Sequence, residues 1–436
     1  MKTVIMAGGK GTRISSVASD IPKPMIKIEG VPVLEREILC LRDQGFKDII
    51  ITVSHLAEHI TGYFGDGKEF GVNIEYFIED QPLGNAGALF KLRDRLTDDF
   101  LLLNADSIFD VDFNRFAKYH RDKDSMVTLF THPNSHPYDS GLIIADDDGK
   151  VERWLTKEDV RPKWYRNRVN AGLHIINPAV LDNADVEIDN IGKDIAGKIV
   201  KVDLDRQILK PLCGTGTMYC YDSPEYVKDM GTPDRYEAVC RDYRDGIVEA
   251  KNLRNKQRAI FLDRDGTLNK EVGFLRNIDD MELLPGVAEA VRKINESGYL
   301  AIVVTNQPVI ARGEVTVPQL SEIHNKLETL LGNEGAYLDA IYYCPHHPDK
   351  GFEGEIPELK VVCDCRKPGP GMLLKAAKDY NIDLSSSWMV GDSSRDVGAG
   401  AAAGCKAALI GDGSFGQDME VESLKEAVEK ILGERV

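Results

Sequence analysis

The chain has 436 residues, 42% of them hydrophobic and 29% charged, which is too long for one ordinary core and typical of two soluble globular domains of roughly 150 to 250 residues each. No apolar run approaches the roughly 20 residues of a membrane-spanning helix, so a membrane partner is excluded. The net charge of -17 argues against a nucleic-acid partner, because such a protein needs a basic face against the phosphates.

The first residues and the cysteines indicate the compartment. Met1 to Met6 lead straight into a glycine turn, without the apolar stretch and cleavage site of a signal peptide, so we expect a cytoplasmic protein. Eight cysteines in a cytosolic chain do not indicate a disulfide framework. Four of them are scattered and predicted to be buried small hydrophobic residues: Cys40, Cys213, Cys220 and Cys240. The oligomeric state stays open.

Short apolar runs rich in β-formers alternate with amphipathic segments of helical length, such as 33–44, through the first half of the chain. The runs cover residues 3–7, 48–53, 100–104 and 126–130. This alternation predicts an α/β domain with a mainly parallel sheet and flanking helices.

A second series of strands and helices follows a change in composition. Basic, acidic and polar residues interleave over 236–258, and we place a helical linker at 241–257. New apolar strands are then predicted at 258–262, 300–304 and 388–390. The sequence therefore predicts two α/β domains, over residues 1–240 and 258–436.

A glycine-rich turn follows the first strand, with the sequence Gly8-Gly9-Lys10-Gly11-Thr12-Arg13. Backbone N–H groups of such a turn can face an anion while Lys10 and Arg13 supply positive charge. Ile21-Pro22-Lys23-Pro24-Met25 then presents another lysine. A glycine turn alone also occurs in dinucleotide-binding folds and plain loops, and the basic residues alone also fit a solvated face.

Together these two segments resemble the sugar-1-phosphate nucleotidylyltransferases, in which a GGxGxR loop and a PKPM segment hold a nucleoside triphosphate. The resemblance covers about residues 1–240, implies a Rossmann-like fold, and recurs at four further places. These are the nucleobase loop at 81–89, Asn104-Ala105-Asp106 at a strand end, the Asn170-Ala171-Gly172 turn and Asp229-Met230-Gly231-Thr232-Pro233.

The resemblance implies a role for each matching residue. Asp106 and Asp229 would share Mg²⁺, and Arg13 and Lys23 would stabilise the departing pyrophosphate, since this transfer needs positioning and charge neutralisation more than covalent chemistry. Nucleotide-binding residues would be Gly8, Gly9, Gly11, Thr12, Gln81 and Gly84. Asn170 would contact the sugar and Lys157 its phosphate, although Thr156-Lys157-Glu158 stands where the family commonly has Glu-Lys-Pro.

In the second half, Asp263-Arg264-Asp265-Gly266-Thr267 follows the apolar strand 258–262. Two carboxylates at the end of a strand lie where α/β proteins bind ligands. Repulsion between two ionised carboxylates so close together costs free energy unless a cation neutralises them. With a cation the pair supplies a nucleophile and an acid/base.

This segment resembles the haloacid dehalogenase-like phosphatases over about residues 258–420, with a Rossmannoid fold. The resemblance implies that Asp263 is the nucleophile, Asp265 the general acid/base, and that both bind Mg²⁺ with Asp392, which Asp396 supports. Thr305 and Asn306 would hold the phosphoryl group together with the lysine of the third motif, Lys367.

A Cys-x-His and a Cys-x-Cys sequence flank a loop rich in Pro, Gly and charge. Their side chains are Cys344, His346, Cys363 and Cys365. Three thiols and an imidazole suit a closed tetrahedral zinc site, which would order the loop and be structural. The alternative is a set of buried thiols beside a surface histidine, and His347 is a weaker candidate ligand.

The zinc loop runs into Arg366-Lys367-Pro368, a combination that resembles the D-glycero-D-manno-heptose 1,7-bisphosphate 7-phosphatases and the histidinol-phosphate phosphatases. The triplet Thr305-Asn306-Gln307 and the segment Ile310-Ala311-Arg312-Gly313 resemble the heptose branch. Arg312 and Arg366 would then hold substrate. Pro308-Val309 replaces the usual Ser-Gly, so the anomer is not determined.

The two halves together resemble a bifunctional heptose enzyme. The second domain would release the 7-phosphate, and the first would join the heptose 1-phosphate to a nucleotide with loss of pyrophosphate. By analogy within the family, heptose 1-phosphates of the α series are joined to GMP from GTP, and those of the β series to AMP from ATP. We prefer GTP as the substrate of this chain. One alternative is a transferase for another sugar 1-phosphate fused to a histidinol-phosphate or other sugar-phosphate phosphatase, and a second is a first domain that binds nucleotide sugar without turnover.

Overall fold

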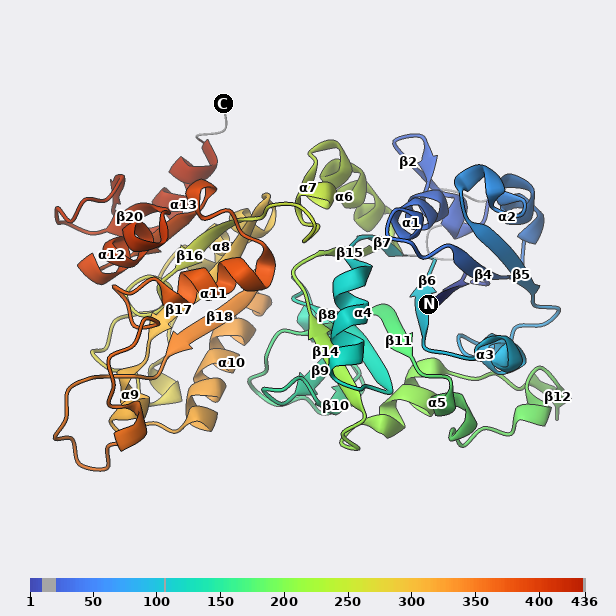
Figure 1. Cartoon of the computed structure of the whole chain (residues 1–436), viewed down its shortest axis with the longest axis horizontal. Coiled ribbons are helices and arrows are strands. Elements are labelled where there is room, and N and C mark those ends of the chain that lie inside the picture. Colours follow the sequence, from blue (N-terminus) through green and yellow to red (C-terminus); the bar gives the residue numbers. More distant parts are fainter. Residues whose placement is uncertain (10–20, 106, 434–436) are drawn as a thin grey trace. The chain divides into compact units, whose positions relative to one another are not determined.

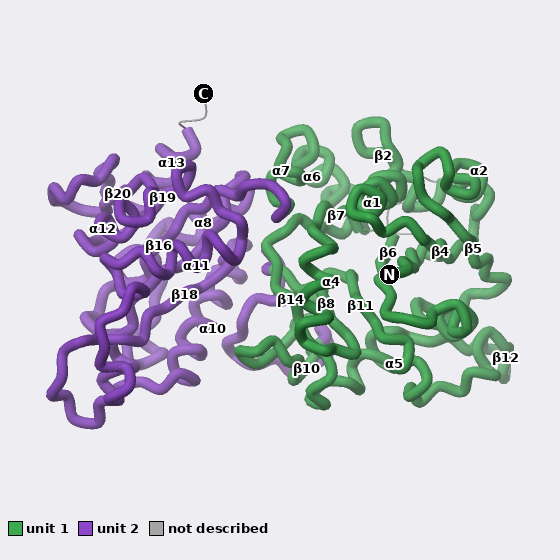
Figure 2. Tube along the Cα trace, viewed as in Figure 1, with its two compact units in different colours: residues 1–132, 141–155, 170–252 green, residues 133–140, 156–169, 253–436 purple. Residues whose placement is uncertain are grey.

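The computed structural model describes residues 1–9, 21–105 and 107–433, and its contacts divide the chain into two compact units (Figure 2). The first unit holds residues 1–132, 141–155 and 170–252, and the second holds 133–140, 156–169 and 253–436. The second unit thus includes two short segments from the half of the chain predicted to form the first domain. The predicted limits, with a linker at 241–257, stay a prediction.

A mixed nine-stranded sheet forms the centre of the described part of the first unit (Figure 1). Its main path runs β10-β9-β11-β6-β1-β4-β5, with β8 beside β11 and β14 beside β8. The pairs of β1 with β4 and β6, of β4 with β5 and of β8 with β14 are parallel, whereas β11 pairs antiparallel with β6. The strands are β1 Lys2–Met6, β4 Asp48–Val53, β5 Asn73–Ile78, β6 Phe100–Asn104, β8 Val127–His132, β9 Leu142–Ala145, β10 Val151–Leu155, β11 Val169–Ile176 and β14 Met218–Asp222.

Apolar side chains cover this sheet on both faces, because successive residues of a strand point to opposite sides. In β1, Ile5 joins one buried cluster and Val4 joins the other. Helices α1 Val33–Arg42, α2 Ala57–Phe64 and α4 Phe113–Asp122 contribute to the cluster of Ile5. Helices α3 Gly87–Lys91 and α5 Ala179–Asp182 contribute to the other cluster. Burial on both faces explains why β1, β4 and β6 read as continuous apolar runs.

Further elements complete the first unit. Strands β7 Ser107–Asp110 and β15 Tyr226–Asp229 pair antiparallel and bring the second predicted magnesium carboxylate to a strand end. The other elements are the ribbons β2 Lys27–Ile28 with β3 Val31–Pro32 and β12 Asp194–Ile195 with β13 Lys198–Ile199, and the helices α6 Pro233–Arg244 and α7 Ile247–Ala250.

The second unit has a six-stranded parallel sheet in the order β18-β17-β16-β19-β20-β21. The strands are β16 Arg258–Leu262, β17 Tyr299–Asn306, β18 Ala340–Cys344, β19 Trp388–Gly391, β20 Lys406–Ile410 and β21 Met419–Val421. The order of strands along the chain reverses between the neighbouring strands β16 and β19. Such a switch point opens a crevice at the carboxyl ends of the strands, where ligands bind in α/β folds.

Helices cover both faces of the second sheet (Figure 1). One face packs against α8 Val287–Asn295, α10 Val317–Asn333 and α13 Leu424–Gly433. The other packs against α11 Gly371–Tyr380 and α12 Ser394–Ala403, while α9 Pro308–Ala311 follows β17 directly. The prediction of two α/β units with mainly parallel sheets is confirmed.

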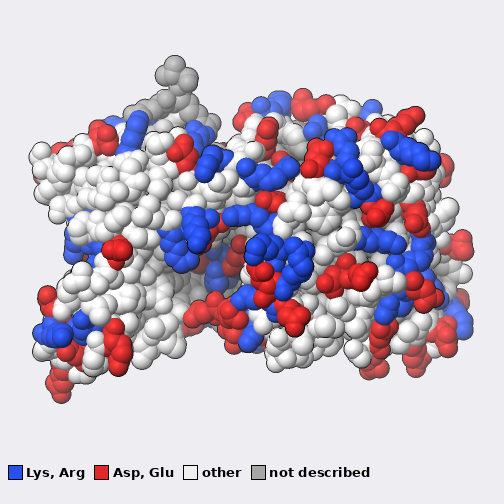
Figure 3. Space-filling model, viewed as in Figure 1, with Lys and Arg blue, Asp and Glu red and all other residues white. Residues whose placement is uncertain are grey.

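Two surface properties bear on the partners. None of the helices in the described ranges is both long and apolar enough to cross a membrane. On the face that Figure 3 shows, Lys and Arg side chains are interspersed with Asp and Glu side chains.

Candidate functional sites

Carboxylates from two neighbouring strand ends converge in the second unit. Asp263 follows β16 and Asp392 follows β19, and oxygen atoms of Asp263, Asp392 and Asp396 lie within 4.8 Å of one another. Gly266 makes this approach possible, because it has a left-handed φ of +78° and an added Cβ would lie 1.9 Å from Asp392 Oδ2. The Asp-x-Asp-Gly sequence therefore needs its glycine for the geometry of the site.

Lys367 lies inside this acidic group. Its Nζ is 2.8 Å from Asp263 Oδ1 and 2.6 Å from Asp396 Oδ1, and the lysine is buried. Burial raises the pKa of Asp263 and Asp396 adds to this effect, while Lys367 opposes it. Burial alone would lower the pKa of Lys367, but Asp263 and Asp396 raise it. The lysine is thus held as an ammonium beside Asp263.

Asp396 holds the lysine, whereas the sequence resemblance implied that it supports Asp392. Asp396 Oδ1 binds Lys367 Nζ. Asp396 Oδ2 accepts hydrogen bonds from Ser393 N at 3.0 Å and from Ser393 Oγ at 2.6 Å, and these bonds cap the start of α12. Asp263 and Asp392 remain as the carboxylates available to a cation. Three close carboxylates against one ammonium leave excess negative charge, which fits a hard divalent cation such as Mg²⁺.

Asp265 lies outside the converging group of described carboxylates. Its oxygens accept hydrogen bonds from Arg264 Nη2 at 2.8 and 2.9 Å, from Asn269 Nδ2 at 3.0 Å and from Gln307 Nε2 at 3.1 Å. Arg264 is fully buried, and its Nη1 lies 3.3 Å from Nε2 of His324 on α10. The structure therefore does not bring the Asp265 carboxylate to the predicted metal ligands, and it adds Arg264 as the residue that orients this carboxylate.

The end of β17 holds Lys367 in place. Asn306 Oδ1 accepts from Lys367 N at 2.9 Å, and Asn306 Nδ2 donates to Lys367 O at 3.0 Å. Thr305 Oγ1 accepts from Gln307 Nε2 at 2.9 Å. The structure thus joins the second and third motifs through Asn306 and Lys367.

Further cations lie near the zinc-loop cluster. Arg312 lies between the rings of Phe274 and Phe352, 4.2 and 4.4 Å from their centroids, and such contacts hold a guanidinium in place. Burial lowers the pKa of Arg366, with Arg395 and Arg312 adding to this effect, while nearby cysteines oppose it. Two neighbouring cations each disfavour the charged form of the other, and an anion bound beside them would relieve this repulsion. The pair is therefore suited to bind an anion.

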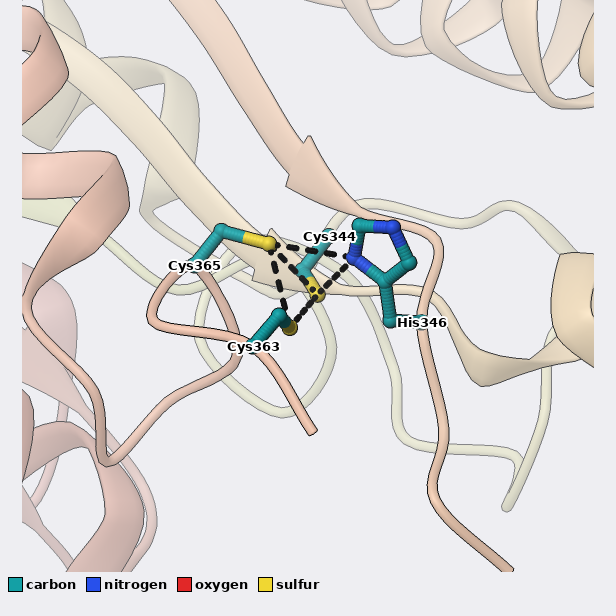
Figure 4. A group of neighbouring side chains, drawn as sticks. All are labelled: Cys344, His346, Cys363 and Cys365. Atoms are coloured by element: carbon teal, nitrogen blue, oxygen red, sulfur yellow. Dashed lines mark hydrogen bonds between the residues drawn. The ribbon is translucent and has the colours of Figure 1, made fainter. Parts of the chain in front are cut away.

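The four predicted zinc ligands come together (Figure 4). The sulfur atoms of Cys344, Cys363 and Cys365 lie 3.1 to 3.6 Å apart, and His346 Nδ1 lies 3.2 Å from Cys365 Sγ and 3.6 Å from Cys344 Sγ. These separations approach the roughly 3.7 Å between sulfurs around tetrahedral zinc with Zn–S bonds of about 2.3 Å. Burial raises the pKa of the Cys344 and Cys365 thiols. The donor set fits zinc, which would favour the thiolates.

In the first unit, Lys23 and Asp229 form an ion pair. Lys23 is buried, and its Nζ lies 3.4 Å from Asp229 Oδ1. Arg235 Nη1 lies 2.7 Å from Asp229 Oδ2. Arg235 stands in the first turn of α6, which Thr232 caps. Arg235 was not predicted, and its signal in the sequence was a cation six residues after a predicted metal carboxylate. The predicted residues Gly11, Thr12, Arg13 and Asp106 lie outside the described residues.

The end of the glycine turn that the structure describes lies beside β4 and β5. Gly8 O accepts from Ser54 Oγ at 2.7 Å, and a Cβ at Gly8 would lie 3.3 Å from Glu79 Oε1. Gly84 has φ +85°, and a Cβ there would lie 2.3 Å from Val202 O, so this loop also needs its glycine. Gln81 is exposed, and Gly9 has open space around it.

The Asn170 turn is held by a buried histidine. Asn170 Oδ1 accepts from Gly172 N at 3.3 Å and from His174 Nε2 at 3.1 Å. Burial lowers the pKa of His174 to about 4, so its imidazole is neutral. His174 was not predicted, and its only signal in the sequence is its place two residues after Gly172, on the same face of the strand. Lys157 is exposed within the segment 156–169 of the second unit.

Comparison with known proteins bears on both halves. The model of the family described as nucleotidyl transferase matches residues 2–246, and the model described as HAD-hydrolase-like matches residues 364–431. The D-glycero-beta-D-manno-heptose-1,7-bisphosphate 7-phosphatase of Salmonella typhi is 48% identical over 145 residues, which are 33% of this chain and 75% of the relative. The phosphatase of the same name from Haemophilus ducreyi is 40% identical over 181 residues, 39% of this chain and 97% of the relative.

Among solved structures, the crystal structure of HddC from Yersinia pseudotuberculosis is 25% identical, with a TM-score of 0.46. That match covers 56% of this chain and 99% of HddC. The family assignment rests on the family models and the phosphatase relatives. The chain belongs to the nucleotidyl transferase family over residues 2–246, and it also belongs to the haloacid dehalogenase-like family of the heptose-bisphosphate phosphatases.

Proposed function

We propose that the chain carries out two reactions on successive forms of one heptose. The second unit hydrolyses the 7-phosphate of D-glycero-D-manno-heptose 1,7-bisphosphate. The first unit then transfers a nucleotidyl group, GMP from GTP, to the heptose 1-phosphate and releases pyrophosphate. The observation that carries the proposal is the buried Lys367 between Asp263 and Asp396, with Asp392 beside them, in a chain that has a nucleotidyl transferase domain.

The arrangement supports a phosphoryl transfer to Asp263. An oxygen of Asp263 attacks phosphorus and the bond from phosphorus to the heptose 7-oxygen breaks, while Asp265 gives its proton to the leaving oxygen. Water then attacks phosphorus of the aspartyl-phosphate, gives a proton to Asp265, and frees Asp263 and phosphate. Lys367 neutralises charge on the transferred group, held by Asn306 and Asp396. Mg²⁺ on Asp263 and Asp392 would supply further charge neutralisation.

A bisphosphate has a second anionic group for the enzyme to hold. The proposal assigns this 1-phosphate to Arg312 and Arg366, whose neighbouring charges favour an anion. Stacking between Phe274 and Phe352 would keep the Arg312 guanidinium in one orientation. Structural zinc on the four ligands near Arg366 would keep the loop in place.

In the first unit the proposal assigns the nucleotide to the glycine turn and to the loop with Gln81 and Gly84. Arg13 and Lys23 would stabilise the pyrophosphate, with Asp106 and Asp229 as ligands of Mg²⁺. Asp229 also pairs with Lys23 and Arg235. Asn170 would bind the sugar and Lys157 its phosphate.

The nucleotide and the anomer are linked. Our preference for GTP implies the α anomer, by analogy within the family. The names of the curated relatives give the β anomer, which by the same analogy goes with ATP. The second candidate is therefore an adenylyltransferase coupled to a phosphatase for the β-bisphosphate.

Mass spectrometry of the products tests the proposal. The protein is incubated with Mg²⁺, one anomer of heptose 1,7-bisphosphate, and GTP, ATP, CTP or UTP in turn. GDP-heptose from the α anomer supports both activities, and ADP-heptose from the β anomer supports the second candidate. Phosphate release without a nucleotide sugar contradicts the proposed transferase, and no phosphate release favours a histidinol-phosphate phosphatase. An Asp106→Ala variant that loses pyrophosphate release but keeps phosphate release excludes a first unit that only binds nucleotide sugar.

A further inference from the structure

The tip of the zinc loop, residues 351–356, packs against the turn that follows α9. Ile356 N donates a hydrogen bond to the carbonyl of the last residue of α9 at 3.0 Å. Gly313 has φ +70°, and an added Cβ there would lie 1.9 Å from Gly354 O, so the two backbones are in direct contact. The tip and this turn both belong to the second unit. The position of Arg312, which begins the turn, therefore depends on the tip as well as on α9.

An aromatic ring of the tip stacks on Arg312. The guanidinium lies 4.4 Å from the ring centroid of Phe352, in the tip, and 4.2 Å from that of Phe274, in the loop after β16. The buried Nε of Arg312 has no hydrogen-bond partner among the described residues. Stacking orients a guanidinium without neutralising its charge. Arg312 is thus fixed in place as a cation, and a guanidinium binds an oxyanion through charge-assisted hydrogen bonds.

Glu355 shapes the tip and holds Phe352 in place. Its Oε2 accepts hydrogen bonds from Gly351 N at 2.9 Å and from Phe352 N at 3.0 Å, which closes the turn of the tip. The same oxygen lies 3.5 Å from Nζ of Lys360, which is buried. Lys360 Nζ in turn lies 4.5 Å from the centroid of the Phe352 ring. Glu355 therefore fixes the backbone of Phe352 directly and its ring through Lys360.

These contacts allow two interpretations, which differ in the substrates that the tip affects. If the tip only stabilises the fold around the phosphatase site, its disruption should weaken the binding of every substrate alike. If the tip orients Arg312, its disruption should weaken only those substrates that carry a second anionic group. The second interpretation is favoured because rings, which do not compete with an anionic substrate, hold the guanidinium. Such a contact needs close positioning, since a shift of about 1 Å can cost about 100-fold in rate.

We propose that Glu355 is a positioning residue that gives the phosphatase its preference for a bisphosphate over a monophosphate of the same sugar. It acts through Phe352, which keeps the Arg312 guanidinium in the orientation that binds the 1-phosphate. This inference rests on the proposed function for the role of Arg312. Because specificity is a difference between two affinities, a change in the tip should affect the bisphosphate and spare the monophosphate.

The test compares full-length Glu355→Ala with wild type and with Glu353→Ala, which changes an exposed glutamate of the same tip. Phosphate release with Mg²⁺ is measured from heptose 1,7-bisphosphate and from heptose 7-phosphate. In Glu355→Ala we expect the KM for the bisphosphate to rise about tenfold, with the KM for the monophosphate and the kcat for both substrates within about twofold of wild type. Glu353→Ala should match wild type with both substrates.

A second variant keeps the test decisive if Glu355→Ala does not fold, since that change leaves Lys360 buried without its carboxylate. Phe352→Leu retains the pair of Glu355 and Lys360 and removes only the ring, so the same rise of about tenfold in the KM for the bisphosphate alone is expected. An equal rise for both substrates in a folded variant, or no rise for either, would overturn the inference.

Failure of the proposed function has a separate signature. If wild type hydrolyses another sugar bisphosphate, the comparison is run with that bisphosphate and its monophosphate. Amide hydrogen exchange of residues 309–314 reports whether the tip holds the turn of Arg312. If wild type hydrolyses no sugar phosphate, the proposed function fails, and faster exchange in Glu355→Ala than in Glu353→Ala still supports the positioning role. Equal exchange in these two variants would contradict it.

Discussion

His174 is a neutral imidazole enclosed in the first unit, and its protonation is tied to one hydrogen bond. Asn170 Oδ1 is an acceptor, so His174 Nε2 carries the hydrogen and Nδ1 does not. Among the described residues, Nδ1 has no hydrogen-bond partner. A second proton would place an unsatisfied charged N–H in the interior, which explains why burial lowers the pKa of His174 to about 4.

This histidine gives the stability of the first unit a defined pH dependence. Since the folded pKa of about 4 lies below the unfolded value of about 6.5, the unfolded chain takes up the proton first. His174 therefore stabilises the fold fully above pH 6.5, and its contribution falls as the pH drops toward 4. We expect wild type to lose about 2 kcal/mol more than His174→Gln between pH 7 and pH 5, as measured by urea unfolding of the first unit. Equal losses in the two proteins would show that His174 is protonated in the fold.

The zinc loop is an element with almost no regular structure of its own. Between Cys344 at the end of β18 and Cys363 it contains one short 3₁₀ turn, Pro357–Leu359. A loop of this length inside a compact domain needs something to order it. Zinc on the four converging side chains would cross-link and close the loop, which runs directly into Arg366 and Lys367. Loss of the metal should therefore disturb the phosphatase site, because the loop that the metal orders leads into Arg366 and Lys367.

We expect elemental analysis to find about one zinc ion per chain in wild type and much less in Cys365→Ser. Phosphate release should fall about tenfold or more, because the segment that carries Lys367 loses its support, whereas pyrophosphate release should be unaffected. Cys405→Ser is the matched control, since Cys405 is a buried free cysteine of the same unit outside the cluster. A zinc content equal to wild type in Cys365→Ser would contradict the proposed site.

The elements differ in how far the sequence predicts them. Strands β1, β4 and β6 and helix α1 follow from hydrophobic periodicity, because a strand buried on both faces and an amphipathic helix leave local patterns. Asp263 follows from its place after an apolar strand, whereas Asp392 and Lys367 were expected only from the resemblance to the haloacid dehalogenase-like phosphatases. The roles of Arg264 and Arg235 do not follow from the sequence, since only the folded turn after β16 and the start of α6 turn each guanidinium toward a carboxylate that is near it in the sequence. Likewise, no local pattern marks residues 156–169 as part of the second unit.

For the whole molecule, the proposal places two reactions in a fixed order on one chain. The phosphatase must act first if the transferase accepts only heptose 1-phosphate. Asp263→Asn separates the steps, because it removes the nucleophile with almost no change of shape and leaves Lys367 paired with Asp396. The second unit should therefore remain folded, and the first unit should retain its substrates.

We expect Asp263→Asn to lower phosphate release by about 10³-fold or more and to abolish formation of nucleotide sugar from the bisphosphate. Supplied with heptose 1-phosphate and the triphosphate, the same variant should release pyrophosphate at the wild-type rate. Asp280→Asn, an exposed surface change in the second unit, should leave both reactions intact. Loss of transfer from heptose 1-phosphate would show that the sites are not independent. A nucleotide sugar that still carries the 7-phosphate would show that transfer does not wait for hydrolysis, because the transferase would then accept the bisphosphate directly.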